Sequence, residues 1–339
     1  MAATAAPAAA HGVGGLQPTN YETRVVRVDP EIRGLQVTSV DLGERLELTN
    51  GTETDVVVLG YDDEPYLRVG PRGAFVNDRS PARSINRTLR GTSRVPASAD
   101  PDAAPEWRRI DDGTTVRWHD HRAHWMGDED PPAVQNDPGS PHLVQPFRVQ
   151  LRTGGETVRV FGDVRWVPPP SPWAWLAGAA ALAIALVALA LRRHLALALA
   201  IGLGLLLGAQ VLHVAGLWGG STASVGSRLG ASAYSLGGIV LTIIGLVLLA
   251  RRGARAAVPV ALLAGLFLAL AGGLADVTTL SRSQVPSTLP AWLDRLSVAV
   301  TIGAGIGLAV AAGLELRRER REGMVPTPLD PSVPSAVGR

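Results

Sequence analysis

The N-terminal half of the chain alternates apolar and polar residues over short stretches, whereas the C-terminal half holds long runs that are almost wholly apolar. Short alternating stretches that are rich in β-branched residues and bounded by Pro, Gly or Asn are typical of β-strands. We predict about eight strands, at residues 23–28, 35–40, 45–49, 55–59, 74–76, 114–118, 147–151 and 157–166. This many short strands favours an immunoglobulin-like or cupredoxin-like β-sandwich, and the pattern does not choose between the two.

Turns and irregular stretches separate these strands. Asn50-Gly51, between the third and fourth predicted strands, is a strong signal for a tight hairpin, and Thr153-Gly154-Gly155 predicts another. The segment 61–66, with three adjacent carboxylates before a Pro, predicts a solvated turn. Residues 78–106 and 128–141 carry little periodicity, and insertions of this length are usually functional or mobile. We expect both to form a rim around the residues that lie between them.

Five apolar runs in the C-terminal half are long enough to cross a bilayer. They lie at about 173–191, 195–217, 231–250, 257–279 and 296–316. A Pro-rich linker at 168–172 separates them from the predicted β-domain at 11–167, and residues 317–339 are expected to form a disordered cytoplasmic tail. The predicted fold class is therefore mixed multi-domain, an N-terminal all-β sandwich followed by a five-helix α transmembrane bundle in the lipid bilayer.

The distribution of arginine predicts the orientation of this bundle, because positive residues concentrate on the cytoplasmic side of membrane proteins. If the β-domain lies outside, nine arginines near the ends of the spans face the cytoplasm and three lie in the outer loops. The nine are Arg192, Arg193, Arg251, Arg252, Arg255, Arg317, Arg318, Arg320 and Arg321, and the three are Arg228, Arg282 and Arg295. We therefore expect a multi-pass plasma-membrane protein with its N-terminal domain outside and its C-terminus in the cytoplasm.

Residues 1–10 predict either the remnant of a signal peptide or a disordered leader. They lack a charged start and a Leu-rich centre, but Ala8 and Ala10 are the small residues that signal peptidase requires before a cleavage point. Export of the β-domain calls for a complete signal peptide, so we expect the true translation start upstream. Cleavage after Ala10 would make His11 the mature N-terminus, where its amino group and imidazole could chelate one metal ion.

Composition excludes several classes of function. The chain has no Cys, which excludes disulfides, thiolate metal sites and Cys nucleophiles. Its formal net charge is only +2, and no arginine run is interleaved with aromatic residues, so we do not expect nucleic acid as a partner. Neither a Walker loop nor a Rossmann fingerprint is present. Any metal site must therefore use His, carboxylate, Met or backbone ligands.

Chemistry concentrates at His119, His121 and His124, which place three of the seven histidines within six residues. If the strand from residue 114 continued through His121, His119 and His121 would lie on one face and could share a metal ion. Imidazole suits copper and zinc, and we expect copper before zinc. The further candidate ligands are His11, His142 and Met126, and Asp120 is expected to accept a hydrogen bond from a ligating ring. The alternative is a surface network of hydrogen bonds and ion pairs that includes Arg122.

Three resemblances bear on this stretch. The spacing His119-Asp120-His121-Arg122-Ala123-His124 resembles the HxHxDH signature of the metallo-β-lactamase superfamily, but Ala123 stands where that family carries an Asp ligand, so we do not expect a hydrolase. The junction Ala8-Ala9-Ala10-His11-Gly12 resembles that of exported copper carriers of the CopC type, which implies a copper-binding β-sandwich. The whole layout resembles uncharacterised envelope proteins of actinobacterial type, which implies no assigned activity.

Four polar residues lie towards the outer ends of the predicted spans. Gln210 and His213 are three residues apart and so share one helical face, Tyr234 begins the third span, and Asp276 lies late in the fourth. Ionisable groups within spans are functional candidates, although satisfaction by interfacial water and head groups is the interpretation that we favour. The spans contain no Met or Cys, which argues against a sulfur relay for Cu(I).

The main hypothesis is an exported metal-binding β-domain that serves metal handling or delivery, with an envelope protein or a metal chaperone as partner. The alternative, from another class, is a non-catalytic envelope scaffold or sensor that binds another protein. An enzyme is the third hypothesis, for which we identify no catalytic residues.

Overall fold

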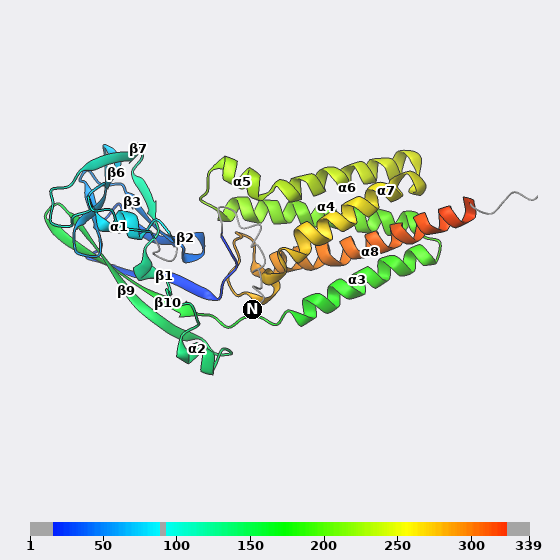
Figure 1. Ribbon diagram of the computed structural model, residues 1–339, viewed down its shortest axis with the longest axis horizontal. Coiled ribbons are helices and arrows are strands. Elements are labelled where there is room, and N and C mark those ends of the chain that lie inside the picture. The colour runs from blue at the N-terminus through cyan, green and yellow to red at the C-terminus, as the bar shows by residue number, and fades with distance from the viewer. Residues whose placement is uncertain (1–15, 89–92, 324–339) are drawn as a thin grey trace, which may run out of the picture. The chain divides into compact units, whose positions relative to one another are not determined.

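The computed structural model describes residues 16–88 and 93–323 (Figure 1). The chain divides into two compact units. The first unit comprises Met1–Pro172 together with Ala215–Ser232 and Thr278–Asp294, and the second comprises Trp173–Val214, Ala233–Val277 and Arg295–Arg339. The first unit contains the β-strands and the second contains most of the long apolar helices, so the predicted order of a β-rich part and a helical part is confirmed.

Ten described strands form two antiparallel sheets in the first unit. The larger sheet has the order β1-β10-β9-β4-β5-β6-β7 and the smaller has the order β2-β3-β8. The strands of the larger sheet are β1 (Tyr21–Asp29), β4 (Val56–Leu59), β5 (Pro65–Gly70), β6 (Gly73–Asn77), β7 (Trp107–Asp111), β9 (His142–Thr153) and β10 (Glu156–Trp166). Those of the smaller sheet are β2 (Leu35–Val40), β3 (Arg45–Asn50) and β8 (Thr115–Trp118).

The two sheets share one hydrophobic core. Leu46 and Leu48 of β3 are completely buried and pair with Trp118 and Val116 of β8. Val58 of the larger sheet belongs to the same core. Alternate residues of a strand point to the same face, so the period of two in the sequence places these apolar side chains together. Two antiparallel sheets are thus confirmed, and their assignment to an immunoglobulin-like or cupredoxin-like sandwich stays a prediction.

The hairpin predicted at Asn50-Gly51 is wrong. β3 pairs with β2 and β8, and β4 pairs with β5 and β9, so the chain passes from one sheet to the other at this point. The Asn50 side chain is buried, and its amide nitrogen donates to the carbonyl oxygens of Thr54 and Val69. Its Oδ1 accepts from the backbone and hydroxyl of Thr52. Asn50 therefore fixes the crossing between sheets instead of a two-residue turn.

The hairpin at Thr153-Gly154-Gly155 is confirmed, because Thr153 of β9 pairs with Glu156 of β10. Gly154 and Gly155 both have positive φ angles, of 56° and 87°. Two consecutive residues with positive φ fit the tight turn that matches the twist of antiparallel strands. The sequence signal and the local backbone agree here because no distant residue competes for this turn.

Two strands and two short helices were not predicted. β5 begins at Pro65 and ends at Gly70, residue types that are depleted in strands, and β7 is an edge strand with mostly exposed side chains and no alternation. The two irregular stretches contain α1 (Pro81–Ile85) and α2 (Pro132–Asn136), each of which starts with Pro in its first turn. The solvated turn is only partly correct, because Glu64 is buried and accepts a hydrogen bond from Ser80.

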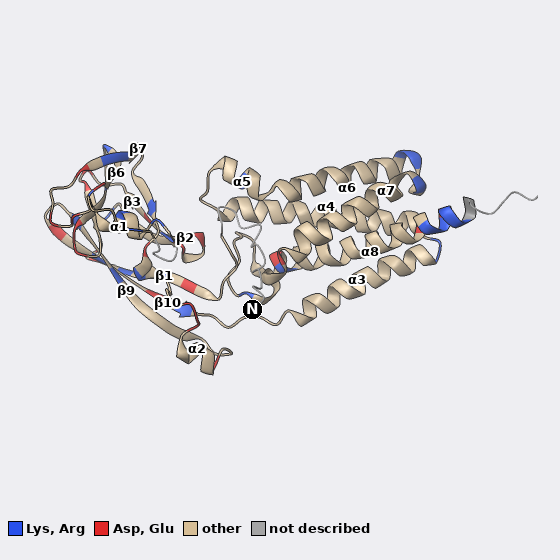
Figure 2. Cartoon of the chain, viewed as in Figure 1, with Lys and Arg blue, Asp and Glu red and all other residues tan. Residues whose placement is uncertain are grey.

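Five described helices are long and apolar enough to cross a membrane, which indicates a multi-pass membrane protein. The helices are α3 (Trp173–Leu191), α4 (Leu195–Gly220), α6 (Ala233–Arg252), α7 (Ala254–Phe267) and α8 (Ala291–Gly323), and the short α5 (Val225–Ala231) follows α4. The apolar stretch of α7 continues through η4 (Leu268–Leu274), a π-helical segment. The end of α6 and the end of α8, which carry arginine, lie at the same end of the second unit (Figure 2).

Glycine lets the helices of the second unit approach closely. A Cβ atom added at Gly303 of α8 would lie 2.5 Å from the carbonyl oxygen of Ala179 in α3. One added at Gly305 would lie 2.9 Å from the carbonyl oxygen of Gly265 in α7. These distances leave no room for a side chain, so glycine at these positions lets α8 pack closely against α3 and α7.

Candidate functional site

The histidine stretch leaves the smaller sheet directly after Trp118, where β8 ends. Residues His121–Ala123 form the single 3-10 turn η3, and Asp120 precedes it as the N-cap. The Asp120 side chain accepts a hydrogen bond from the backbone N–H of Arg122, 3.1 Å away. Asp side chains that bond to the backbone two residues ahead favour turns over strands. The strand predicted at 114–118 is confirmed, and it does not continue through His121, which was the condition for His119 and His121 to share one strand face.

Asp120 and Arg122 form a buried ion pair. Arg122 donates to the carboxylate through Nε and an Nη, at 2.9 and 2.8 Å, and Trp118 donates its indole N–H at 2.9 Å. Burial alone would raise the pKa of Asp120, but the hydrogen bonds and charge of Arg122 outweigh it and lower that pKa. Arg122 also donates to the carbonyl oxygens of Leu59 and Gly60. Through these hydrogen bonds Arg122 connects η3 to the end of β4.

The three histidine rings gather beside this pair. The His119 ring lies 4.9 Å from the His121 ring, almost perpendicular to it, and stacks on the His124 ring at 4.3 Å with 29° between the planes. Nδ1 of His119 and Nε2 of His124 lie 2.7 and 3.1 Å from one carbonyl oxygen, that of Glu44. Nε2 of His121 lies 2.8 Å from the carbonyl oxygen of Thr88. A carbonyl oxygen only accepts, so these ring nitrogens donate.

Burial favours the uncharged forms of two groups in this region. Burial lowers the pKa of His124 to about 4, and the neighbouring His119 acts in the same direction. Burial also raises the pKa of Glu44 to about 7. A buried environment disfavours the charged form of either type of group. His124 is therefore neutral at physiological pH, and Glu44 carries less than a full negative charge.

The positions of the rings do not form a metal site. Among residues 16–88 and 93–323, no group of three or more His, Cys, Asp or Glu side chains is arranged to hold a metal ion. An imidazole binds a metal in the plane of its ring at about 2 Å. Two stacked rings at the separation of His119 and His124 cannot both direct a nitrogen to one ion at that distance. The predicted copper or zinc site has no support from this arrangement.

The remaining predicted ligands do not join this cluster in any described contact. His142 begins β9, pairs with Trp166 and contacts the carbonyl oxygen of Asp137 at 2.6 Å. Met126 is exposed. Both oxygens of Asp120 are engaged by Trp118 and Arg122 instead of by a histidine ring. His11 lies outside the described residues.

A cleft of about 440 Å³ borders the histidine cluster and was not predicted. Its basic lining residues are Arg45, Arg83, Arg87, Arg108 and Arg117, and its apolar ones are Tyr66, Leu67, Val76, Ile110 and Trp118. Glu44 and His119 line the cleft, so the histidine cluster borders it through His119, and Glu44 is the one acidic residue among the described lining. The cleft is therefore bordered by both sheets, and most of its charged lining residues are arginines.

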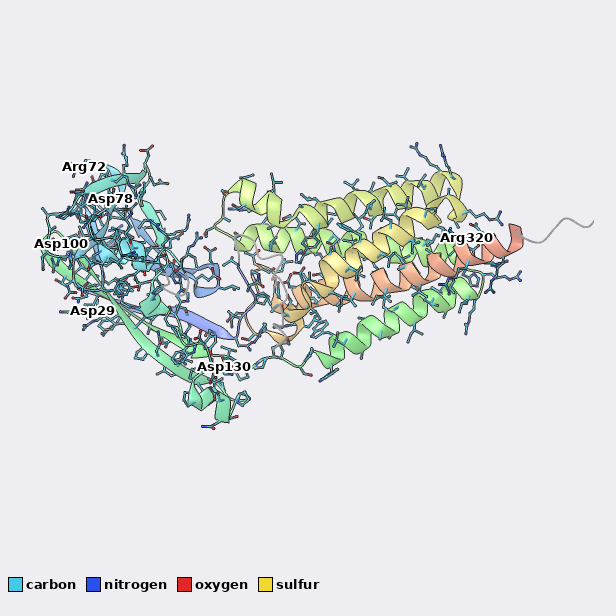
Figure 3. The ribbon with its side chains drawn as sticks, in the orientation of Figure 1. Asp29, Arg72, Asp78, Asp100, Asp130 and Arg320 are labelled. Carbon is cyan, nitrogen blue, oxygen red and sulfur yellow. The ribbon has the colours of Figure 1, made fainter. Side chains whose placement is uncertain are left out.

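Carboxylates outside the cleft hold its arginines in place. Asp78, labelled in Figure 3, pairs with Arg83 at 3.2 Å and with Arg108 at 3.1 Å, and Glu47 pairs with Arg117. These arginines come from α1, β7 and β8, which are far apart in the sequence. No local motif links them, and β7 itself was not predicted. The sequence contains 32 basic residues, but such a count does not locate a cleft.

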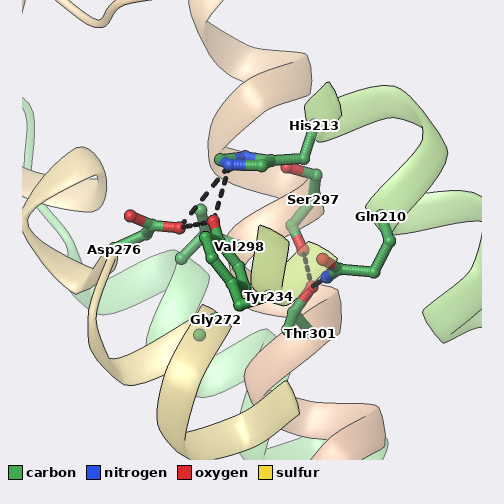
Figure 4. A pocket seen from close by; sticks show the side chains of 9 residues that line it. Gln210, His213, Tyr234, Gly272, Asp276, Ser297, Val298 and Thr301 are labelled. Carbon is green, nitrogen blue, oxygen red and sulfur yellow. Dashed lines mark hydrogen bonds and ion pairs between the residues drawn. The ribbon is translucent and has the colours of Figure 1, made fainter. Parts of the chain in front are cut away.

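The four polar residues predicted in the helices do come together in the second unit (Figure 4). The Tyr234 hydroxyl donates to Asp276 at 2.6 Å and lies 2.8 Å from Nε2 of His213. Gln210 donates through Nε2 to the Thr301 hydroxyl at 3.0 Å. Gln210 is only 2% exposed and Tyr234 only 9%. These two side chains thus have hydrogen-bond partners inside the protein, and their predicted position at the membrane interface stays a prediction.

No protein-family model, curated protein or solved structure matches the chain. The resemblances to copper carriers and to envelope proteins therefore gain no support from relatives.

Proposed function

We propose that the chain is a multi-pass membrane binding protein whose β-sheet unit takes up a small anionic molecule in the arginine-lined cleft. The gathering of five arginines around this cleft carries the proposal. Ligand pockets usually measure about 300–1,000 Å³, and the cleft, at about 440 Å³, falls within that range. This function belongs to the class of sensors or receptors and requires no catalytic residue.

The arginines of the cleft favour a ligand that carries negative charge. A guanidinium has five N–H donors in a fixed plane that matches a carboxylate or phosphate. The ion pair of Arg108 with Asp78 runs through Nε and leaves the terminal nitrogens of that guanidinium outside the described pairing. The raised pKa of Glu44, which burial causes, reduces the negative charge that would repel an anion. The lining thus favours a carboxylate or a phosphate ester.

The apolar base of the cleft restricts the ligand further. Trp118 and Tyr66 are buried core residues that also line the cleft, and Ile110 is exposed beside them. Aromatic side chains offer a large apolar surface with a polar edge. Trp118 and Tyr66 expose only 4% and 6% of their surface, so the apolar contact open to a ligand comes mainly from Ile110, which is 44% exposed and which an inorganic anion would leave unused. We therefore propose a ligand with one anionic group and an apolar or aromatic body.

Calorimetric titration of the full chain in detergent tests the proposal with phenyl phosphate and benzoate as probes and benzyl alcohol as the neutral analogue. We expect one binding site for an anionic probe, with affinity that falls as NaCl is raised, because salt screens exposed charges. Binding of benzyl alcohol as tight as that of the anions would contradict the proposal, as would the absence of binding by both anions.

Arginine variants locate the site. Arg87→Gln and Arg108→Gln should each weaken binding about tenfold or more, because a hydrogen bond to a charged group is worth roughly 1.5–3 kcal/mol. Arg72→Gln is the matched control, since Arg72 is exposed and does not line the cleft (Figure 3). Equal affinity of all three variants would place the anion elsewhere.

A transition metal bound by His119, His121 and His124 is the second candidate. Its supporting observation is that one ring N–H of each histidine donates a hydrogen bond to a backbone carbonyl oxygen, the arrangement that orients ligating histidines in metal sites. Binding would require one of the stacked rings to turn. In this role the protein would serve metal handling or delivery, with copper before zinc and a metal chaperone or envelope protein as partner.

Titration of the full chain with Cu(II) and with Zn(II) tests the second candidate. Stoichiometric binding that is lost in His119→Ala with His121→Ala, and kept in His142→Ala, would support a metal site at the cluster. Binding that persists in the double variant would exclude it. The anion titrations are independent of this outcome because their variants leave the histidines in place.

For location, we propose a plasma-membrane protein with the β-sheet unit outside and the C-terminus in the cytoplasm. The nine arginines on one side and the three on the other support this orientation. An outside cleft would meet its anionic ligand before the bilayer.

A further inference from the structure

The arginines that line the cleft of the first unit outnumber the carboxylates that pair with them. Arg45 pairs with Asp41 at 3.8 Å, and Arg117 pairs with Glu47. Each of these two arginines is matched by a carboxylate of its own, so the two pairs add no net charge to the cleft. The net charge of the cleft is therefore decided by its other three arginines, which are Arg83, Arg87 and Arg108.

Those three arginines have a single carboxylate among them. Nη1 of Arg83 lies 3.2 Å from Oδ1 of Asp78, and Nε of Arg108 lies 3.1 Å from Oδ2 of the same side chain. Arg87 is exposed, and its guanidinium makes no hydrogen bond or ion pair with residues 16–88 or 93–323. Three positive charges are thus set against one negative charge, which leaves an excess of two.

One further carboxyl group lines the cleft, that of Glu44. It forms no ion pair with any of the five arginines in the part of the chain that the structure describes. Burial raises the pKa of Glu44 to about 7, although the charge of Arg45 opposes this shift. At neutral pH Glu44 therefore carries only part of one negative charge. The excess of positive charge around the cleft then still exceeds one unit charge.

The excess charge lies in one part of the cleft. The backbone N–H of Arg87 donates to the carbonyl oxygen of Ser84 at 3.3 Å, so the turn of α1 continues as far as Arg87. Residues four apart on a helical turn share one face, which places Arg83 and Arg87 side by side. Asp78, labelled in Figure 3, joins Arg83 to Arg108 of β7. The Arg83 and Arg108 side chains are 33% and 50% exposed, so both remain open to a ligand between α1 and β7.

We propose that the ligand of this cleft is a phosphate monoester, which presents two negative charges to Arg83, Arg87 and Arg108 through one group. The proposal rests on the anion-binding function proposed above and names the class of anion. A phosphate monoester carries about 1.5–2 negative charges at pH 7 on three acceptor oxygens, whereas a carboxylate or a phosphodiester carries one. Complementary charge gives a binding site its preference among ligands. Three acceptor oxygens also offer each of the three guanidinium groups a partner.

Calorimetric titration of the full chain in detergent tests the proposal with probes that differ in charge. At about pH 7.5 phenyl phosphate carries two charges, because its second pKa is near 6. Methyl phenyl phosphate carries one charge on nearly the same body, and benzoate also carries one. We expect phenyl phosphate to bind about tenfold or more tighter than either, because a hydrogen bond between charged groups is worth at least about that factor. Inorganic phosphate, which lacks the apolar body, should bind more weakly than phenyl phosphate.

The outcomes separate this proposal from the anion-binding function. Equal affinities for phenyl phosphate, methyl phenyl phosphate and benzoate would overturn the phosphate monoester and leave an anion-binding cleft. Inorganic phosphate that binds as tightly as phenyl phosphate would also overturn it, because the cleft would then select free phosphate. If none of these anions bound, both the phosphate monoester and the anion-binding function would be contradicted.

Variants of Arg87 test whether the excess charge causes the preference. Arg87→Gln should weaken the binding of phenyl phosphate about tenfold or more and that of methyl phenyl phosphate less, so the ratio of the two affinities should fall. Arg87→Lys keeps the charge and should keep most of the ratio. Arg72→Gln is the matched control, because Arg72 is exposed, lies outside the cleft lining and pairs with Asp55 at 3.1 Å (Figure 3). An unchanged ratio in Arg87→Gln, or an equal decrease in Arg87→Lys, would overturn the proposal that charge selects the phosphate monoester.

Discussion

The imidazole rings of His119 and His124 stack at 4.3 Å and both donate to the carbonyl oxygen of Glu44. The Glu44 side chain and His124 also line one pocket of about 180 Å³. Two titratable groups with opposite pKa shifts thus lie beside each other. Burial causes both shifts, and it acts in opposite directions on an acid and a base.

We predict that the stability of the first unit changes little between pH 4.5 and 6.5. The folded pKa of His124 is about 4, below the usual 6.5, so its contribution is present above pH 6.5 and is lost as the pH falls towards 4. The folded pKa of Glu44 is about 7, above the usual 4.5, so its contribution is present below pH 4.5 and is lost as the pH rises towards 7. The free energy of unfolding, followed by tryptophan fluorescence across this pH range, measures the sum of the His124 and Glu44 contributions.

Single variants should expose each contribution separately. In Glu44→Gln, stability should rise with pH between 4 and 6.5, by on the order of 2 kcal/mol, because only His124 remains. In His124→Gln, stability should fall with pH between 4.5 and 7, by a smaller amount because solvent screens Glu44. If the free energy of unfolding changed with pH in the same direction in both variants, the assignment of opposite contributions to His124 and Glu44 would be contradicted.

The buried ion pair makes Asp120 the most sensitive residue of the histidine stretch. Asp120→Ala leaves the Arg122 guanidinium buried without its counter-charge, so we expect a loss of about 3–5 kcal/mol in the free energy of unfolding. The double variant Asp120→Ala with Arg122→Met should recover part of that loss, because no uncompensated charge remains. Asp112→Ala is the control: its pair with Arg109 is exposed and worth about 0–1 kcal/mol. Chemical denaturation of the three variants makes the comparison.

Asn50 and Gly51 distinguish the crossing between sheets from the hairpin that their sequence suggests. Asn50→Ala should cost about 2–3 kcal/mol, because the buried carbonyl oxygens of Thr54 and Val69 lose their donor. Gly51 has no positive φ, so Gly51→Ala should cost less. If Asn50 and Gly51 formed a tight hairpin, Gly51→Ala would cost more stability than Asn50→Ala. Gly155→Ala, at a positive φ of 87°, is the control for a true turn glycine and should cost about 1 kcal/mol or more.

Local patterns predicted the parts of this fold that local interactions decide. Leu46 and Leu48 alternate with polar residues, and that period was sufficient to place β3 with its apolar face in the core. The membrane helices followed from hydropathy in the same way. The role of Asn50 could not be predicted, since its partner Val69 is nineteen residues away in another strand.

Local sequence patterns also predicted only part of the candidate sites. The positions of His213, Tyr234 and Asp276 along their spans predicted a common depth, because the rise per residue of a helix is fixed. Their hydrogen bonds depend on how each helix is rotated about its axis, which only packing decides. The cleft depends on Arg83, Arg108 and Arg117, which three separate elements bring together. The apolar pattern that predicts strands and spans contains no information on such distant pairs.

Single cysteines test the proposed orientation without background, because the chain has no Cys of its own. Glu156→Cys lies in the exposed hairpin between β9 and β10, and Arg320→Cys lies in the exposed end of α8. In intact cells, a membrane-impermeant maleimide should label the first variant and not the second, and permeabilisation should expose both. Labelling of Arg320→Cys alone in intact cells would reverse the orientation.

Helix packing in the second unit predicts opposite effects for two glycine substitutions. Gly303→Ala places a methyl group 2.5 Å from the Ala179 carbonyl oxygen, so α8 must move away from α3, at a cost of about 1–3 kcal/mol. Gly204→Ala, in α4, meets nothing within 4 Å, and alanine stabilises a helix by about 0.5–1 kcal/mol relative to glycine. We therefore expect a lower Tm for the first variant and an equal or higher Tm for the second in detergent. A decrease of equal size in both would mean that the approach of α8 to α3 does not limit stability.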